Sequence, residues 1–100
     1  MEKPIIRAHP VALGMTELVL PLSYQILSVR KQHGAWKLWE LSVADDRNPP
    51  MKVKICSFLT GEAIPNGVYI DTVVDGDSVW HWWEVWGEEV PSFAKKVESS

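Results

Sequence analysis

Apolar and polar residues alternate along much of the chain with the two-residue period of β-strands, and Pro and Gly separate the alternating stretches. No long window keeps apolar positions at helical spacing without a Pro or Gly inside it. The pattern therefore predicts a mainly β fold with little or no helix. The predicted strands cover residues 4–9, 16–20, 24–32, 35–43, 52–59, 68–74 and 78–86.

Two dipeptides predict tight hairpins. His33-Gly34 separates the third and fourth predicted strands, and Asp75-Gly76 separates the last two. Asp and Gly both tolerate the left-handed backbone conformation that a type I′ turn requires, so Asp75-Gly76 is the stronger signal. We also expect the two N-terminal strands, 4–9 and 16–20, to be able to pair with each other.

Six or seven short strands at this spacing favour a small antiparallel β-sandwich or barrel, and the pattern leaves both architectures open. The prolines in residues 45–50 and the turn residues in 60–67 predict exposed loops between strands. One hundred residues suit a single domain. We therefore expect one β domain over residues 1–100, with 91–100 as a frayed tail.

The tryptophans are the unusual feature of the last predicted strand. Alternation places Trp80, Trp82 and Trp86 on one side, and Val79, His81, Trp83 and Val85 on the other. A compact fold of this size cannot easily hide every indole, and exposed indoles often anchor a partner. We expect at least one exposed aromatic patch, with Trp80, Trp82 and Trp86 as its leading candidates.

The fourth predicted strand also divides into two faces. Trp36, Leu38, Glu40 and Ser42 alternate with Lys37, Trp39, Leu41 and Val43. The second set is the more apolar, so it is expected to face the core. Trp36 would then be partly exposed and join the predicted binding surface.

Charge is distributed unevenly along the chain. Residues 1–60 hold eight Lys/Arg against five Asp/Glu, whereas residues 61–100 hold two against eight, which gives +3 and −6. Such an acidic second half disfavours direct binding to nucleic acid phosphates. Its loops can instead steer the protein to a basic partner, and the candidate residues are Asp75, Asp77, Glu88 and Glu89.

No constellation of reactive residues is visible. His9, His33 and His81 lack the spacing of metal ligands, and the chain has no phosphate-binding loop or nucleophile elbow. Cys56, the single cysteine, lies in an apolar segment and is expected to be a buried structural thiol. We therefore expect no catalytic residue, no metal and no cofactor. The absence of a signal peptide or a spanning segment predicts a cytoplasmic protein.

Several strand motifs resemble, in order, those of a family of small uncharacterised bacteriophage and prophage proteins. They are Ile26-Leu27-Ser28-Val29, Leu38-Trp39, a turn at Gly61, Tyr69-Ile70-Asp71-Thr72-Val73, and Val79-Trp80-His81-Trp82-Trp83-Glu84. The resemblance covers roughly residues 20–86. Asp71 departs from it, because the family often has Gly there, and so does the density of Trp near the end. The resemblance implies a phage accessory protein made in a bacterium, and it supplies no catalytic residues.

Three hypotheses follow. The leading one is a non-enzymatic inhibitor that binds a host defence complex by protein–protein contact; a CRISPR effector is one candidate partner, by analogy with anti-CRISPR proteins. The second is a small phage structural or assembly component, whose partner is another phage protein or a second copy of the chain. The third is a β module that binds a carbohydrate or another small ligand on its aromatic rings.

Overall fold

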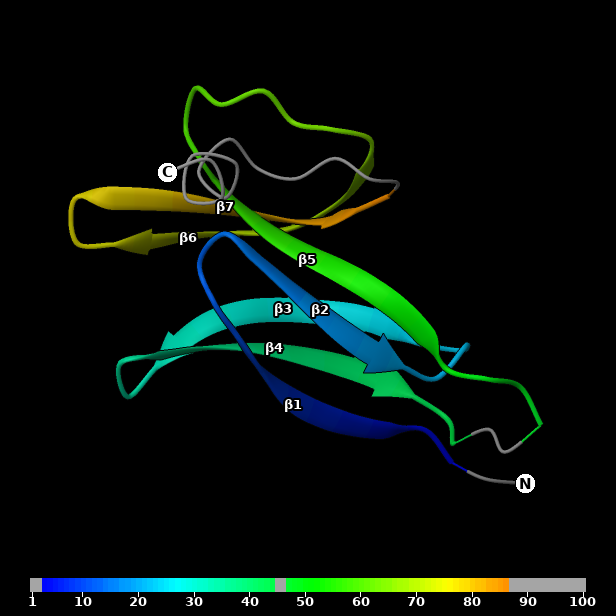
Figure 1. Ribbon diagram of the computed structural model, residues 1–100. Helices are drawn as coiled ribbons and strands as arrows, with labels where there is room; N and C mark the ends of the chain where they lie inside the picture. The colour runs from blue at the N-terminus through cyan, green and yellow to red at the C-terminus, as the bar shows by residue number, and fades with distance from the viewer. Residues whose placement is uncertain (1–2, 45–46, 87–100) are drawn as a thin grey trace.

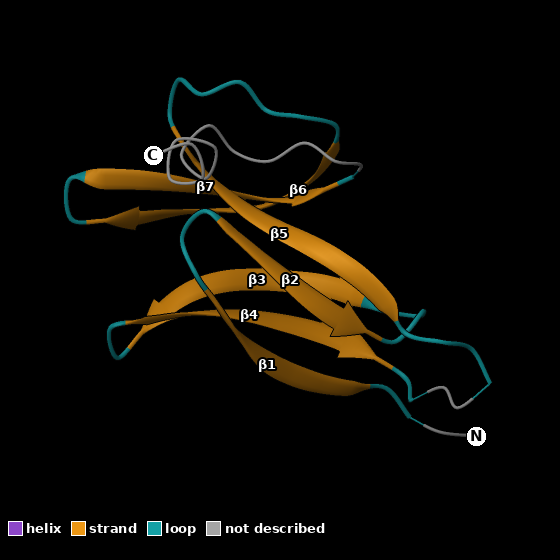
Figure 2. Cartoon of the chain, in the orientation of Figure 1, coloured by secondary structure: helices purple, strands orange, loops and turns teal. Residues whose placement is uncertain are grey.

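The computed structural model describes residues 3–44 and 47–86, and this part of the chain contains seven β-strands and no helix (Figure 2). The strands are β1 (Ile5–Val11), β2 (Met15–Leu20), β3 (Gln25–Gln32), β4 (Ala35–Ser42), β5 (Met51–Leu59), β6 (Gly67–Asp75) and β7 (Ser78–Val85). The predicted β class is therefore confirmed. Because these residues include no helix, they contain none long and apolar enough to cross a bilayer.

The strands form two antiparallel sheets that lie face to face (Figure 1). One sheet has three strands in the order β1-β4-β3, and the other has four in the order β2-β5-β7-β6. Every pairing of neighbouring strands is antiparallel. The two sheets do not close into a barrel, so the sandwich is the architecture adopted.

The N-terminal strands do not pair with each other, and our expectation that they could is wrong. Strand β1 pairs with β4 and strand β2 pairs with β5, so the chain crosses from one sheet to the other between them. The crossing lies at Ala12–Gly14, where the backbone N–H of Gly14 donates to Ser57 Oγ at 2.7 Å. The Gly14 carbonyl in turn accepts from the N–H of Ser57 at 2.9 Å. These two bonds attach the crossing segment to β5.

Both predicted hairpins form. His33 and Gly34 both have positive φ, 52° and 80°, as a type I′ turn requires. In the second hairpin Asp75 pairs with Ser78, so the two-residue loop is Gly76-Asp77. Only Gly76 has a positive φ there, at 60°, which corresponds to type II′ rather than the predicted type I′. Glycine at the first central position satisfies that turn without requiring a left-handed Asp.

The core between the sheets is built around Trp82, whose side chain is fully buried. Its indole lies 5.2 Å from that of Trp36, centroid to centroid, so each sheet contributes one ring to a tilted pair. An indole buries on the order of 200 Å², and such pairs contribute beyond their buried area. The buried residues of this cluster are Val11, Leu20, Val29, Trp36, Leu38, Val53, Ile55, Trp80 and Trp82.

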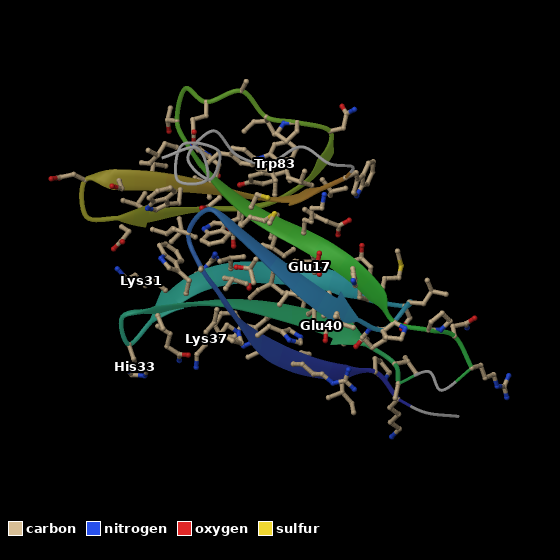
Figure 3. The ribbon with its side chains drawn as sticks, viewed as in Figure 1. Glu17, Lys31, His33, Lys37, Glu40 and Trp83 are labelled. Atoms are coloured by element: carbon tan, nitrogen blue, oxygen red, sulfur yellow. The ribbon has the colours of Figure 1, made fainter. Side chains whose placement is uncertain are left out.

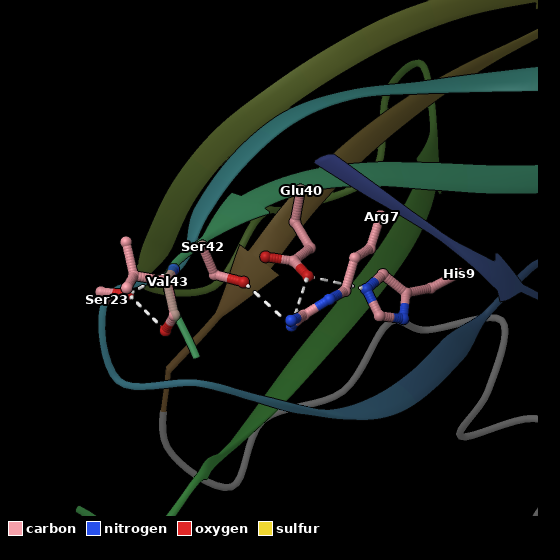
Figure 4. A network of polar contacts seen from close by, with 6 residues as sticks. All are labelled: Arg7, His9, Ser23, Glu40, Ser42 and Val43. Carbon is pink, nitrogen blue, oxygen red and sulfur yellow. Dashed lines mark hydrogen bonds and ion pairs between the residues drawn. The ribbon is translucent and has the colours of Figure 1, made fainter. Parts of the chain in front are cut away.

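The inward face of β4 is the opposite of the predicted one. Trp36, Leu38, Glu40 and Ser42 are buried, whereas Lys37, Trp39 and Leu41 are only partly so. Glu40 can enter the core because β1 supplies it with polar partners (Figure 4). Its Oε1 lies 3.1 Å from His9 Nε2 and 3.9 Å from Arg7 Nη1. A buried carboxylate is tolerated when it is paired in this way.

The polar network around Glu40 continues to the end of β4. Arg7 donates to Ser42 Oγ at 3.2 Å, and the next residue, Val43, donates its N–H to Ser23 Oγ at 3.0 Å (Figure 4). Strand β1 is thereby held to β4 by side chains as well as by its backbone ladder, and the segment before β3 is attached to the end of β4. Glu40 Oε2 and Trp82 Nε1 have no hydrogen-bond partner among the described residues.

A carboxylate joins the two sheets where β3 lies along β6. Asp71 Oδ2, on β6, accepts from the backbone N–H of Val29 at 3.2 Å, and the same oxygen forms an ion pair with Arg30. Asp71 Oδ1 accepts from the N–H of Thr72 at 2.9 Å. Further along, Lys31 pairs with Asp75 at 2.9 Å. Asp71 therefore satisfies an edge donor of β3 that its own sheet leaves unpaired.

We expect Asp71→Ala to lower the free energy of unfolding by about 1–3 kcal/mol, because it leaves the Val29 N–H and the Arg30 guanidinium without their acceptor. Urea unfolding followed by tryptophan fluorescence measures this. Asp77→Ala is the matched control, since Asp77 is exposed at the tip of the β6–β7 hairpin. Equal effects of the two substitutions would contradict the role given to Asp71.

Candidate functional site

The structure separates the tryptophans that we expected to form one exposed patch. Trp80 and Trp82 are 8% and 0% exposed and Trp36 is 8% exposed, so these three belong to the core and not to a surface. Strand β7 is central in its sheet, and its inner face meets the three-stranded sheet, which is why its indoles fill the interior. Only Trp86 has the predicted exposure, at 57%.

The predicted acidic residues also differ in their surroundings. Asp75 is half-buried and forms an ion pair with Lys31, so its charge is compensated within the fold. Asp77 is exposed in the hairpin loop. Glu88 and Glu89 lie outside the described residues. Asp77 is therefore the one described member of this acidic set that faces solvent.

A groove lies elsewhere, on the side of the four-stranded sheet that faces away from the core. Its volume is about 260 Å³. The loop between β5 and β6 passes over this side of the sheet and forms one wall (Figure 1). The residues that line the groove are Leu59, Thr60, Gly61, Glu62, Ile64, Tyr69, His81 and Trp83.

Two aromatic rings form the centre of the groove. Tyr69 on β6 and Trp83 on β7 lie opposite each other in the strand pairing, with ring centroids 5.7 Å apart and planes at 71°. Tyr69 is 52% exposed. Trp83 is half-buried and lies on the side of β7 away from the three-stranded sheet (Figure 3). The edge-to-face arrangement leaves aromatic surface available to a ligand.

A line of polar groups runs beside these rings. The Tyr69 hydroxyl is 2.8 Å from Thr72 Oγ1, which is 3.1 Å from His81 Nδ1. His81 Nε2 is 2.8 Å from Thr60 Oγ1 on the other wall. Both ring nitrogens of His81 are thus engaged, and the imidazole is held in one orientation. The groove combines fixed aromatic faces with fixed hydroxyl groups.

The loop wall is ordered by Glu62. Its Oε2 accepts from the backbone N–H of Leu59 at 2.6 Å, and its own N–H donates to the Leu59 carbonyl at 3.2 Å. Gly61, between them, has a φ of 99°, which few other residues adopt. This turn directs a carboxylate into the lining of an otherwise apolar and hydroxyl-bearing groove.

Beneath the groove lies a second, smaller hydrophobic cluster. Cys56, Phe58 and Val85 are buried, and Trp83 packs against them. Burial raises the pKa of the Cys56 thiol to about 12, with Lys54 opposing the shift. The predicted burial of Cys56 is confirmed, and at neutral pH it is a thiol rather than a reactive thiolate.

A second pocket, also of about 260 Å³, lies at the end of the sandwich beside Trp86. Glu84 there accepts from the Tyr24 hydroxyl at 2.8 Å and from Trp86 Nε1 at 2.7 Å, through different oxygens. Burial, followed by the hydrogen bond and the charge of Glu84, raises the pKa of Tyr24 to about 12. Both carboxylate oxygens of Glu84 therefore already have protein partners, and the other charged residues that line this pocket are Lys52 and Lys54.

Within residues 3–44 and 47–86, no three His, Cys, Asp or Glu side chains lie close enough together to hold a metal ion. His81, the histidine of the groove, is bonded to two threonine hydroxyls. The described groups of the groove suit contact by stacking, hydrogen bonding and charge.

Comparison with known proteins gives a family. A domain of unknown function, DUF7352, matches residues 1–92, nearly the whole chain. The chain belongs to the DUF7352 family. No curated protein and no solved structure matches it significantly.

Sequence reasoning missed the groove of this DUF7352 domain, although part of its signal was present. Alternation in the last strand had placed His81 and Trp83 on the same side, opposite Trp80 and Trp82. Tyr69 and Thr72 are three residues apart, which in a regular strand would send them to opposite faces. A bulge between Tyr69 and Asp71 brings both to the outer face. No residue pattern indicated that bulge.

We expect Cys56 to resist a disulfide-exchange reagent such as 5,5′-dithiobis(2-nitrobenzoate) at pH 8, because it is buried and its raised pKa leaves little thiolate. The same thiol should react rapidly after unfolding in urea. Absorbance of the released thionitrobenzoate gives both rates, and the single cysteine makes the assignment unambiguous. Rapid labelling of the folded protein would contradict the small cluster beneath the groove.

Proposed function

We propose that this DUF7352 domain is a non-catalytic binding protein that recognises another protein through the groove on the outer face of β6 and β7. The observation that carries the proposal is the exposed Tyr69 ring set edge to face against Trp83, beside apolar Leu59 and Ile64. Aromatic residues in such surroundings are frequent hot spots of protein interfaces.

The surrounding surface supports a macromolecular partner. Leu59 and Ile64, which line the groove beside Tyr69, are each 38% exposed. Apolar side chains gathered around aromatic anchors are typical of the buried centre of an interface. Thr60 and Thr72, each hydrogen-bonded to His81, supply polar groups that can fix the orientation of a bound partner.

For the biological setting we propose the one that the strand motifs imply, a phage accessory protein acting in a bacterium. Its partner is then a host defence complex, with a CRISPR effector as one candidate, and the domain inhibits by occupying a surface. The resemblance of the strand motifs supports this setting, and the groove supports action by contact with another protein. A preorganised interface lowers the entropic cost of binding, and the groove lies on two paired strands of the sandwich.

We expect Tyr69→Ala to weaken binding of the partner by about 2 kcal/mol, roughly 30-fold, because it removes an exposed anchor from the groove. Affinity capture from a bacterial lysate, with quantitative mass spectrometry, compares it with the native domain. Val74→Ala is the control, since Val74 is exposed on the same strand but does not line the groove. A partner retained equally by both variants would count against the groove.

The inhibitory role has its own readout. Expressed in a bacterium whose CRISPR system targets an infecting phage, the native domain should raise the efficiency of plating, and Tyr69→Ala should not. Both proteins should be without effect in the same strain lacking the system. No change in plating in strains that carry each of the major CRISPR types would remove that partner class and leave the binding proposal to the capture experiment.

A second candidate function is favoured by one observation. Aromatic rings next to a line of hydroxyl groups, Tyr69, Thr72 and Thr60, are also suited to stacking a sugar ring and bonding its hydroxyls. A glycan array probed with the native domain and with Tyr69→Ala separates the two. Hits lost in the variant would support a carbohydrate module over a protein-binding one.

A further inference from the structure

The residues that line the groove all lie in an acidic segment of the chain. Residues 59–86 contain five carboxylates and no Lys or Arg. Two of these carboxylates are engaged with β3, Asp71 with Arg30 and Asp75 with Lys31, and Glu84 is buried. Glu62 is the acidic residue that lines the groove itself.

The position of Glu62 leaves part of its carboxylate available. Oε2 is bound to the Leu59 N–H, and Oε1 has no hydrogen-bond partner among the described residues. The side chain is half-buried, so its charge is less screened than that of a fully exposed carboxylate. Such a group favours a cationic donor in the adjacent cavity.

The aromatic pair favours the same kind of ligand. The faces of Trp and Tyr rings carry negative potential and attract a cation placed within about 6 Å of the ring centre. Tyr69 and Trp83 are inclined at 71° and both line the cavity, so the face of one ring can receive a cation there. Two independent features, ring faces and a carboxylate, thus line one cavity of about 260 Å³.

We propose that the groove receives an arginine side chain of the partner protein, stacked on the Tyr69–Trp83 pair and bonded to Glu62; this rests on the proposed protein-binding function. A guanidinium is planar, stacks on aromatic faces and donates in a fork that matches a carboxylate. The ammonium group of a lysine carries a point charge but has no flat face that can stack on the rings. Lys54, on the same face of the sheet, is not among the lining residues, and none of the described residues that line the groove is Lys or Arg.

The probe is the peptide acetyl-Gly-Arg-Gly-amide, compared with the same peptide carrying neutral citrulline, which has nearly the shape of arginine. Each is titrated into the ¹⁵N-labelled domain while the indole N–H resonance of Trp83 is followed. We expect saturable shifts with the arginine peptide, and binding of the citrulline peptide weaker by roughly 3- to 10-fold, the size of a partly desolvated cation–π and ion-pair contribution.

The matched variants are Glu62→Gln and Asp77→Asn. Gln retains an oxygen for the Leu59 N–H and so keeps the turn, while the charge is removed. We expect Glu62→Gln to weaken the arginine peptide by roughly 3- to 10-fold and Asp77→Asn by less than about 2-fold, because Asp77 carries an equal charge outside the groove. Unchanged amide spectra elsewhere verify that both variants fold.

Three results would overturn the inference: no saturable shift with the arginine peptide at millimolar concentration, equal binding of the citrulline peptide, or equal effects of Glu62→Gln and Asp77→Asn. Each is distinct from failure of the proposed function. If partner capture depends on Tyr69 while the arginine peptide does not bind, the interface stands and its occupant is not arginine. If capture does not depend on Tyr69, the protein-binding function fails whatever the peptide does.

Discussion

The contact between Trp36 and Trp82 is the interaction on which the rest of the structure depends. One ring comes from each sheet, the centroids are 5.2 Å apart, and Trp82 is completely buried. A chain of this length has few residues with which to fill the space between two sheets, and indoles fill it most efficiently. One face of strand β7 therefore lies in the core, and Trp80 and Trp82 point inward from it.

The position of the outer groove follows from the burial of this face of β7. Successive side chains of a strand point to opposite faces, so burying Trp80 and Trp82 sends His81 and Trp83 outward. Strand β6, paired with β7 at the edge of the sheet, places Tyr69 opposite Trp83 and Thr72 opposite His81. On its other side β6 is held to β3 through Asp71. The same two strands thus complete the core and present the aromatic and polar groups of the groove.

Local sequence signals were sufficient to predict the positions of the strands, but not which face of each strand is buried. The hairpins at His33-Gly34 and Gly76-Asp77 depend on residues adjacent in sequence, and the seven strands could be predicted. The inward face of β4 could not, because Glu40 is tolerated in the core only through His9 and Arg7, which are 31 and 33 residues away. Hydrophobicity alone favoured the wrong face. The burial of Trp36, Trp80 and Trp82, and the bulge at Tyr69, likewise depend on which strands become neighbours.

The most direct test of this account is ¹⁹F NMR of the domain labelled with 5-fluorotryptophan, with the resonances assigned by single Trp→Phe substitutions. The shift between H₂O and D₂O reports solvent contact at each indole. The account requires a large shift for Trp86, an intermediate one for Trp83, and almost none for Trp36, Trp80 and Trp82. A shift of Trp82 comparable to that of Trp86 would contradict it, because the two sheets could not then be joined through the indole pair.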